Sequence, residues 1–265
     1  EDPAFDTNFD PTAESANYID TGGGPCGLVL DETNGRLYVF TRFDNTLASI
    51  DLGSKATLET HALHNPEPQS IVDGRPFLYD AANTSGNGEA SCSSCHIFGD
   101  TDQLAWNLGD PDASVSSNTQ PSAIGLLPAQ PFFHPMKGPM TTQTLKGMAT
   151  HGAMHWRGDR VDGFFGLDSC AEPSGAFCSE DHSFNNFIVA FEGLVGKHGT
   201  ISTPDMQLFT DFILRVMLPP NPDRGLNNVG SAAANAGEAR FFGAASDGVG
   251  NCDSCHRLDP VSGFF

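Results

Sequence analysis

The stretch Cys92-Ser93-Ser94-Cys95-His96 is the most informative part of this sequence. The same pattern of residues recurs as Cys252-Asp253-Ser254-Cys255-His256. Both stretches read C-x-x-C-H. Two thiols at this spacing can form thioethers to both vinyl groups on one edge of a haem, and the adjacent histidine then lies under the iron as an axial ligand. The sequence therefore predicts two covalent c-type haems, one held by Cys92, Cys95 and His96 and one by Cys252, Cys255 and His256.

Two other kinds of site use paired cysteines at this spacing. A structural zinc site can take four thiolates from two C-x-x-C motifs, and a redox-active C-x-x-C forms a reversible disulfide. Zinc does not account for the histidine that directly follows each motif, and a redox dithiol predicts no second copy. Haem attachment is therefore the favoured interpretation.

A short aromatic segment and a flexible loop precede each motif, at residues 74–80 and 236–242. Cytochrome c domains commonly place a helix there, so we expect one before each motif. Two further helices are predicted from apolar residues at helical spacing. One stripe is Phe184, Phe187, Ile188 and Phe191. The other is Phe209, Phe212, Ile213 and Val216, with Thr203 as its N-cap, Pro204 at the first helical position and its end at Pro219-Pro220.

The N-terminal part has a β pattern. Residues 27–30, 36–42 and 46–52 read as short strands, residues 55–63 as a fourth, and Asn34-Gly35 as a hairpin turn. With 29 Gly and 18 Pro in 265 residues, we expect many loops elsewhere. The predicted fold is mainly α with extensive loops, a dihaem cytochrome c-like domain over residues 74–265, plus a small antiparallel β element within residues 1–73.

The charge balance limits the partners. The chain has 13 Lys and Arg and 33 Asp and Glu, which gives a net charge of −20. This charge disfavours binding to nucleic acid and to anionic membranes. No apolar run approaches the roughly 18 residues of a membrane-spanning helix. Haem attachment occurs outside the cytoplasm, so we expect a periplasmic or extracellular protein, where Cys170 and Cys178 can form a disulfide. Cys26 is left over, either buried or paired with another chain.

From residue 74 onward the chain resembles the bacterial dihaem cytochrome c peroxidase superfamily. The resemblance rests on the haem motifs and on residues 134–145 and 155–160. The N-terminal strands resemble one blade of a YVTN-type β-propeller. A single blade cannot bury both faces, so we expect it to pack on the haem domain or on another copy of the chain.

The resemblance implies further site residues. His134 matches a histidine that can bind the first iron on its distal side, and Trp156 matches a tryptophan that lies between the haems. Family members also have a C-terminal tail that supplies a distal methionine for the second iron, and this sequence stops before it. We expect His155 or His151 in that role, with Met148 and Met154 as alternatives.

The family often holds calcium between its haems. Asp100, Asp102 and residues 107–112 are the candidates, although turn formation is the favoured explanation for them.

The predicted function is extracytoplasmic electron transfer by two closed haems, with other redox proteins or copies of the chain as partners. A homo-oligomer is expected, and a head-to-tail contact that does not close would give an electron-conducting filament. The alternative is a dihaem peroxidase that reduces hydrogen peroxide. It needs an acid or base beside an open iron, for which Glu192 and Asp159 are conceivable.

Overall fold

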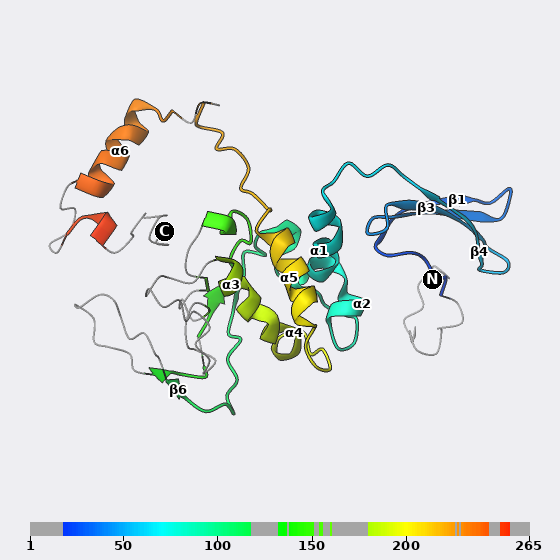
Figure 1. Ribbon diagram of the computed structural model, residues 1–265, viewed down its shortest axis with the longest axis horizontal. Helices are drawn as coiled ribbons and strands as arrows, with labels where there is room; N and C mark the ends of the chain where they lie inside the picture. Colours follow the sequence, from blue (N-terminus) through cyan, green and yellow to red (C-terminus); the bar gives the residue numbers. More distant parts are fainter. Residues whose placement is uncertain are drawn as a thin grey trace, which may run out of the picture. The chain divides into compact units, whose positions relative to one another are not determined.

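The computed structural model describes residues 18–117, 132–136, 138–150, 154–155, 160, 180–225, 227, 229–243 and 250–254 (Figure 1). The chain divides into two units, Glu1–Pro68 and Gln69–Phe265. Helix α1 spans Gln69–Tyr79, so the predicted boundary after residue 73 falls inside a helix. Residues 69–73 therefore belong with the second unit.

The first unit contains the predicted antiparallel sheet. Its strands are β1 (Pro25–Asp31), β2 (Arg36–Thr41), β3 (Thr46–Asp51) and β4 (Thr57–Ala62), in sequence order across the sheet. The turn between β1 and β2 forms as the Asn-Gly pair predicts: Asn34 Nδ2 donates to Asp31 Oδ2 at 2.7 Å, and Gly35 has a φ of +61°. A side chain there would be strained.

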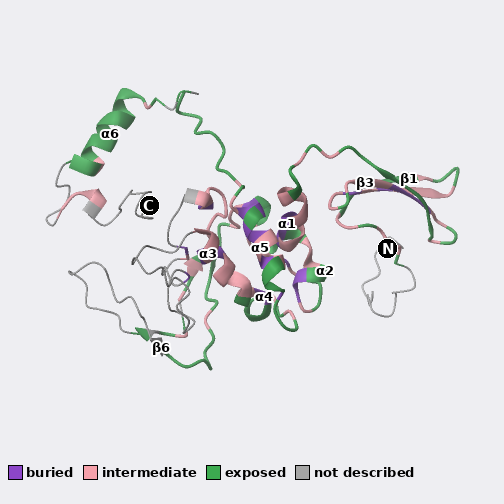
Figure 2. Cartoon of the chain, viewed as in Figure 1, coloured by how far each residue is buried: buried purple, intermediate pink, exposed green. Residues whose placement is uncertain are grey.

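The centre of this sheet is buried and its outer strands are exposed. Val39 of β2 and Ile50 of β3 are fully covered, whereas Leu28 and Val29 of β1 are about two-thirds exposed, at 66% and 65% (Figure 2). Cys26 also lies on β1 and is an exposed free thiol. The alternative that Cys26 is buried is therefore wrong, and its pairing with another chain stays a prediction.

The core of the second unit forms where α1 packs on α5 (Thr203–Ile213). Gly74 of α1 makes the close approach, because a side chain there would collide with Phe212 Cβ and the Leu208 carbonyl. Phe209 lies at the centre of the aromatic packing. The ring centroids of Phe77, Phe184 and Phe191 lie within 6.2 Å of its own ring centroid. The remaining buried members are Leu78, Met148, Met154, Ile201, Met206, Phe212 and Ile213.

The two helices predicted from apolar stripes form with different bounds. The Phe184 to Phe191 stripe is divided among α3 (Glu180–Asn185), the 3₁₀ turn η5 (Asn186–Val189) and α4 (Ala190–Gly193). Asn186 Nδ2 donates to the Arg160 carbonyl, 26 positions earlier in the chain, and helical periodicity does not predict such a contact. Helix α5 is capped by Ser202, whose Oγ accepts the Asp205 N–H at 3.2 Å. The predicted N-cap at Thr203 is thus one residue late, and the helix ends at Ile213, before the predicted end at Pro219-Pro220.

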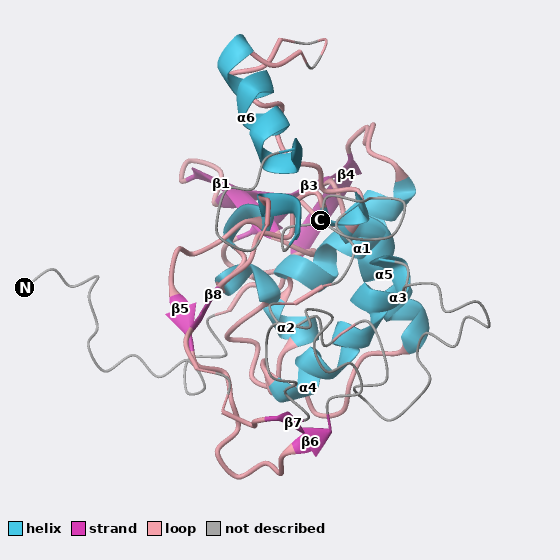
Figure 3. Cartoon of the chain, turned by 90° about the vertical axis from the view of Figure 1, so that its left-hand side faces the viewer, coloured by secondary structure: helices cyan, strands magenta, loops and turns pink. Residues whose placement is uncertain are grey.

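Short elements and loops make up the rest of the described chain (Figure 3). They are α2 (Ala81–Thr84), the 3₁₀ turns η2 (Cys92–Ser94), η3 (Ile97–Gly99), η4 (Met148–Thr150) and η6 (Cys252–Ser254), α6 (Ala232–Gly243), and the ladders β5 (Ala105–Trp106) with β8 (Met140–Thr141) and β6 (Ser116–Ser117) with β7 (Phe132–Phe133). Helices hold 34% of the described residues, so helices with an N-terminal antiparallel sheet are observed and a mainly α fold is not confirmed. Within the described ranges no helix has the length and apolarity to cross a membrane.

Candidate functional site

The first C-x-x-C-H motif forms a tight turn. Cys92–Ser94 is the 3₁₀ turn η2, and the N–H groups of Cys95 and His96 both donate to the Cys92 carbonyl, at 3.3 and 2.9 Å. Ser94 Oγ accepts the Ser91 N–H at 3.1 Å, which closes the turn at its start. The two cysteines and the histidine are thereby gathered on one short stretch of backbone.

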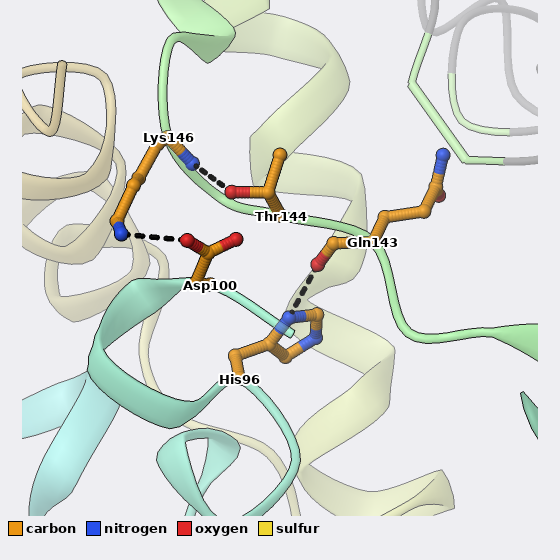
Figure 4. A network of polar contacts seen from close by, with 5 residues as sticks. All are labelled: His96, Asp100, Gln143, Thr144 and Lys146. Carbon is orange, nitrogen blue, oxygen red and sulfur yellow. Dashed lines mark hydrogen bonds and ion pairs between the residues drawn. The ribbon is translucent and has the colours of Figure 1, made fainter. Parts of the chain in front are cut away.

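A backbone carbonyl orients the histidine of this motif. His96 Nδ1 lies 2.8 Å from the Gln143 carbonyl oxygen (Figure 4). A carbonyl can only accept, so Nδ1 carries the proton and Nε2 keeps its lone pair. Burial lowers the pKa of His96, although hydrogen bonds oppose the shift, and the ring is therefore neutral at pH 7. A neutral imidazole with a free Nε2 lone pair, fixed through Nδ1, is the form that ligates a metal.

Gln143 reaches His96 because residues 140–147 run beside residues 99–106. The β5–β8 ladder pairs Trp106 with Met140, and the Leu145 N–H donates to the Gly99 carbonyl at 2.9 Å. Next to the histidine, Lys146 Nζ lies 2.7 Å from Asp100 Oδ2. The hydrogen bond from Lys146, aided by Thr144, lowers the pKa of Asp100, so this carboxylate stays ionised.

The two thiols are free and protonated. Cys92 packs against the core of the second unit, and burial raises the pKa of its thiol to about 11. Burial and the nearby Asp102 carboxylate also raise the pKa of Cys95. A redox-active C-x-x-C needs a thiol with a lowered pKa. The arrangement therefore does not suit dithiol redox chemistry, and it leaves both sulfurs available for a covalent bond.

Several apolar side chains close to the motif in sequence are exposed to solvent. Phe98, which follows the motif in a left-handed conformation with a φ of +55°, is 82% exposed. Trp106 is 42% exposed although its Nε1 donates to Asp102 Oδ2 at 2.8 Å. Ile97 and Leu104 are also exposed. A large planar apolar group bonded to the cysteines would find apolar surface here, so the residues present fit a haem.

The second motif repeats the first where it is described. Cys252–Ser254 is again a 3₁₀ turn, η6, and a helix again precedes the turn and contacts it. For the first motif that helix is α1, and for the second it is α6, whose Phe242 carbonyl accepts a hydrogen bond from Asn251 Nδ2. The prediction of a helix before each motif is confirmed. Cys255 and His256 lie outside the described residues.

The structure locates only part of the predicted distal ligands. His134 is exposed, and its Nδ1 accepts the Met136 N–H at 3.0 Å. Nδ1 is occupied by this hydrogen bond, so His134 would have to give it up to bind iron through Nδ1. His155 is half-buried with a strained φ of +73°, and its ring meets the Phe187 ring edge-on at 5.9 Å. The ligand roles of both stay predictions, and His151, Trp156 and the Cys170–Cys178 pair lie outside the described residues.

The acidic residues proposed for calcium form turns and ion pairs. Asp100 binds Lys146. Asp102 accepts the Leu104 N–H and the Trp106 indole, and Asp110 Oδ1 accepts the Asp112 N–H at 2.9 Å. Across the parts of the chain that the structure describes, no group of three or more His, Cys, Asp or Glu residues could hold a metal ion. The turn-forming alternative accounts for these contacts.

Sequence reasoning did not identify Gln143, Asp100 or Lys146 as partners of His96. Gln143 contributes only its backbone carbonyl, which every residue type has. Its place depends on the alignment of two segments more than forty positions apart, since the His96–Gln143 contact spans 47 residues. The stretch over residues 134–145 that carries the family resemblance includes Gln143, and this was the signal available.

Comparison with known proteins does not assign a family. No family model matches the chain, and no curated protein matches it. A solved structure of Kuenenia stuttgartiensis hydrazine synthase, pressurized with 20 bar xenon, aligns with 21% sequence identity and a TM-score of 0.44. The alignment covers 76% of this chain and 52% of that chain, about half its length. At this TM-score the two folds differ too much to support a functional statement.

Proposed function

We propose that this protein is a dihaem c-type cytochrome that transfers electrons outside the cytoplasm. A haem at the first motif would be bonded to Cys92 and Cys95 and ligated by His96, and a second would be held by Cys252, Cys255 and His256. Each would supply reversible one-electron chemistry at its iron. We further propose that the chain exchanges electrons with other redox proteins or with copies of itself, in the periplasm or outside the cell.

The hydrogen bond from His96 Nδ1 to the Gln143 carbonyl, 2.8 Å long, carries this proposal. It places the proton on Nδ1 and leaves Nε2 as the ligating atom. The same bond makes the ring a stronger electron donor and fixes its plane, which are the properties required of an axial ligand.

The surrounding residues have distinct tasks in this function. The η2 turn gathers the two thiols and the imidazole. The packing of Cys92 against the core anchors the motif to α1 and α5, so that the iron position would change little between oxidation states. Small rearrangement on electron transfer favours an electron carrier. Phe98 and Trp106 would pack their exposed apolar surface against the haem and thereby keep water from it.

The covalent part of the proposal is tested by intact-mass spectrometry of the chain produced in a bacterium that matures c-type cytochromes. The wild type should carry two haems, and the Cys92→Ala/Cys95→Ala and Cys252→Ala/Cys255→Ala variants one each. Ser93→Ala is the matched control within the first motif and should keep both. A wild-type chain without covalent haem that binds zinc stoichiometrically would refute the proposal in favour of the structural metal site.

The proposal of self-association has some support from the N-terminal sheet, whose outer strand β1 exposes Leu28, Val29 and Leu30. Sedimentation of the haem-loaded protein over a wide concentration range tests it. Oligomers that dissociate when Val29 is replaced by lysine would support it, because a charge on an edge strand blocks pairing. A monomer at every concentration would contradict it and leave the haem proposal intact.

A further inference from the structure

Two charged residues bridge the segments that carry His96 and Gln143. Asp100 follows His96 by one turn, and Lys146 follows Gln143 by three positions. Their side chains meet with Lys146 Nζ 2.7 Å from Asp100 Oδ2 (Figure 4). The ion pair therefore joins the chain just after the histidine to the chain just after its carbonyl partner.

Two hydrogen bonds from backbone N–H groups accompany this ion pair. The Lys146 N–H donates to Thr144 Oγ1 at 3.2 Å, and the Leu145 N–H donates to the Gly99 carbonyl at 2.9 Å. The Lys146 side chain is only 23% exposed, whereas that of Asp100 is 44% exposed. A pair this open contributes little to global stability, so its substitution should leave the fold intact and a local role can be tested.

We propose that the Asp100–Lys146 ion pair is a positioning device, which keeps the Gln143 carbonyl on His96 and thereby sets the reduction potential of the haem at the first motif. The proposal rests on the proposed function. A carbonyl that accepts the Nδ1 proton makes the imidazole a stronger donor to iron, and this favours the ferric state. Loosening the carbonyl weakens that donation and raises the potential.

The sign of the change in reduction potential distinguishes a positioning role from a direct electrostatic effect of the Lys146 charge. Removing the Lys146 ammonium without any movement takes a positive charge from the neighbourhood of the iron. That loss favours the ferric state and lowers the potential. A positioning role predicts the opposite sign for the same substitution, so Lys146→Met distinguishes the two.

The experiment is a spectroelectrochemical titration of the haem-loaded full chain and its variants. For Lys146→Met, one of the two potentials should rise, with about a tenfold change in the reduction equilibrium constant, or about 59 mV. Lys146→Arg and the exchanged pair Asp100→Lys/Lys146→Asp keep an ion pair and should stay near the wild-type value. Lys197→Met is the matched control, because Lys197 lies in the same unit and its Nζ donates to the Asn83 carbonyl at 2.8 Å.

A second readout follows the hydrogen bond itself. The His96 Nδ1 proton should exchange with solvent faster in Lys146→Met than in the wild type, as measured by NMR of the paramagnetic protein. A potential that falls or does not change in Lys146→Met, or an arginine variant that behaves like the methionine variant, would overturn the inference. Absence of haem on Cys92 and Cys95 by mass spectrometry would instead be a failure of the proposed function.

Discussion

Among single residues, His96 determines what the first motif can do. Its Nδ1 is committed to the Gln143 carbonyl, so only Nε2 is left for a metal. The cysteines beside it are protonated thiols, since burial raises the pKa of both. The chemistry of the site therefore divides cleanly: the sulfurs supply covalent attachment and the imidazole supplies coordination.

This division predicts the result of replacing His96 by methionine. The thioether bonds do not require the imidazole, so the haem should remain attached in His96→Met. Methionine ligation raises the potential of haem iron, and we expect a change of at least about tenfold in one reduction equilibrium, about 59 mV. Redox titration measures it, with Ser93→Ala as the control. Loss of all covalent haem from the variant would contradict the separate roles.

The residue types of the site were predictable and their arrangement was not. Two cysteines and a histidine at fixed spacing identify the motif because the chemistry needs those side chains. Gln143 acts through its backbone, and Asp100 pairs with a lysine 46 positions away, so neither leaves a local pattern. His134 shows the converse: the resemblance marks it as a ligand, but only the structure shows that its Nδ1 is engaged by Met136.

At the scale of secondary-structure elements, the packing of α1 on α5 connects the haem motif to the core. Gly74 lies at the crossing, where a side chain would meet Phe212 Cβ and the Leu208 carbonyl. Because one of these is backbone, the site cannot adjust by moving a flexible side chain. Gly74→Ala should lower the free energy of unfolding by about 1–3 kcal/mol, measured by urea denaturation.

The matched control for this prediction is Gly237→Ala. Gly237 lies in the middle of α6, and nothing approaches the position of an added Cβ within 4 Å. Alanine is the better helix former by about 1 kcal/mol, so this variant should be neutral or more stable. Equal destabilisation by both substitutions would mean that the α1–α5 contact is not the cause.

The start of α5 gives a second prediction at this scale. Ser202 Oγ accepts the Asp205 N–H at 3.2 Å and satisfies an otherwise open donor. Ser202→Ala should cost about 1 kcal/mol of stability. Thr203→Ala at the neighbouring exposed position should cost less, measured in the same denaturation series. If Thr203→Ala proved the more damaging, the cap would be at Thr203, as the sequence pattern suggests.

The elements themselves were predictable where one local signal dominated. The Asn-Gly turn and the short apolar runs beside it predict the N-terminal sheet, and the apolar stripe from Phe209 to Ile213 predicts α5. The stripe from Phe184 to Phe191 predicted one helix, but contacts from elsewhere divide it, including the donation by Thr200 Oγ1 to the Ile188 carbonyl at 2.7 Å. Such long-range bonds are invisible to helical periodicity.

At the scale of the whole molecule, the core of the second unit and the first motif form one structure. Phe209, 3% exposed, contacts the rings of Phe77, Phe184 and Phe191, and Cys92 packs on the same cluster. Phe209→Ala should cost about 3–5 kcal/mol and reduce the yield of haem-loaded protein. Phe242→Ala on α6, where the ring is 41% exposed, is the control and should cost much less.

The central claim, two closed haems in an electron carrier, is tested most directly by the EPR spectrum of the fully ferric protein with and without hydrogen peroxide. We predict two low-spin haem signals per chain that peroxide does not change. A high-spin signal that peroxide consumes would identify an open iron and a peroxidase, and the absence of any haem signal would contradict the account altogether.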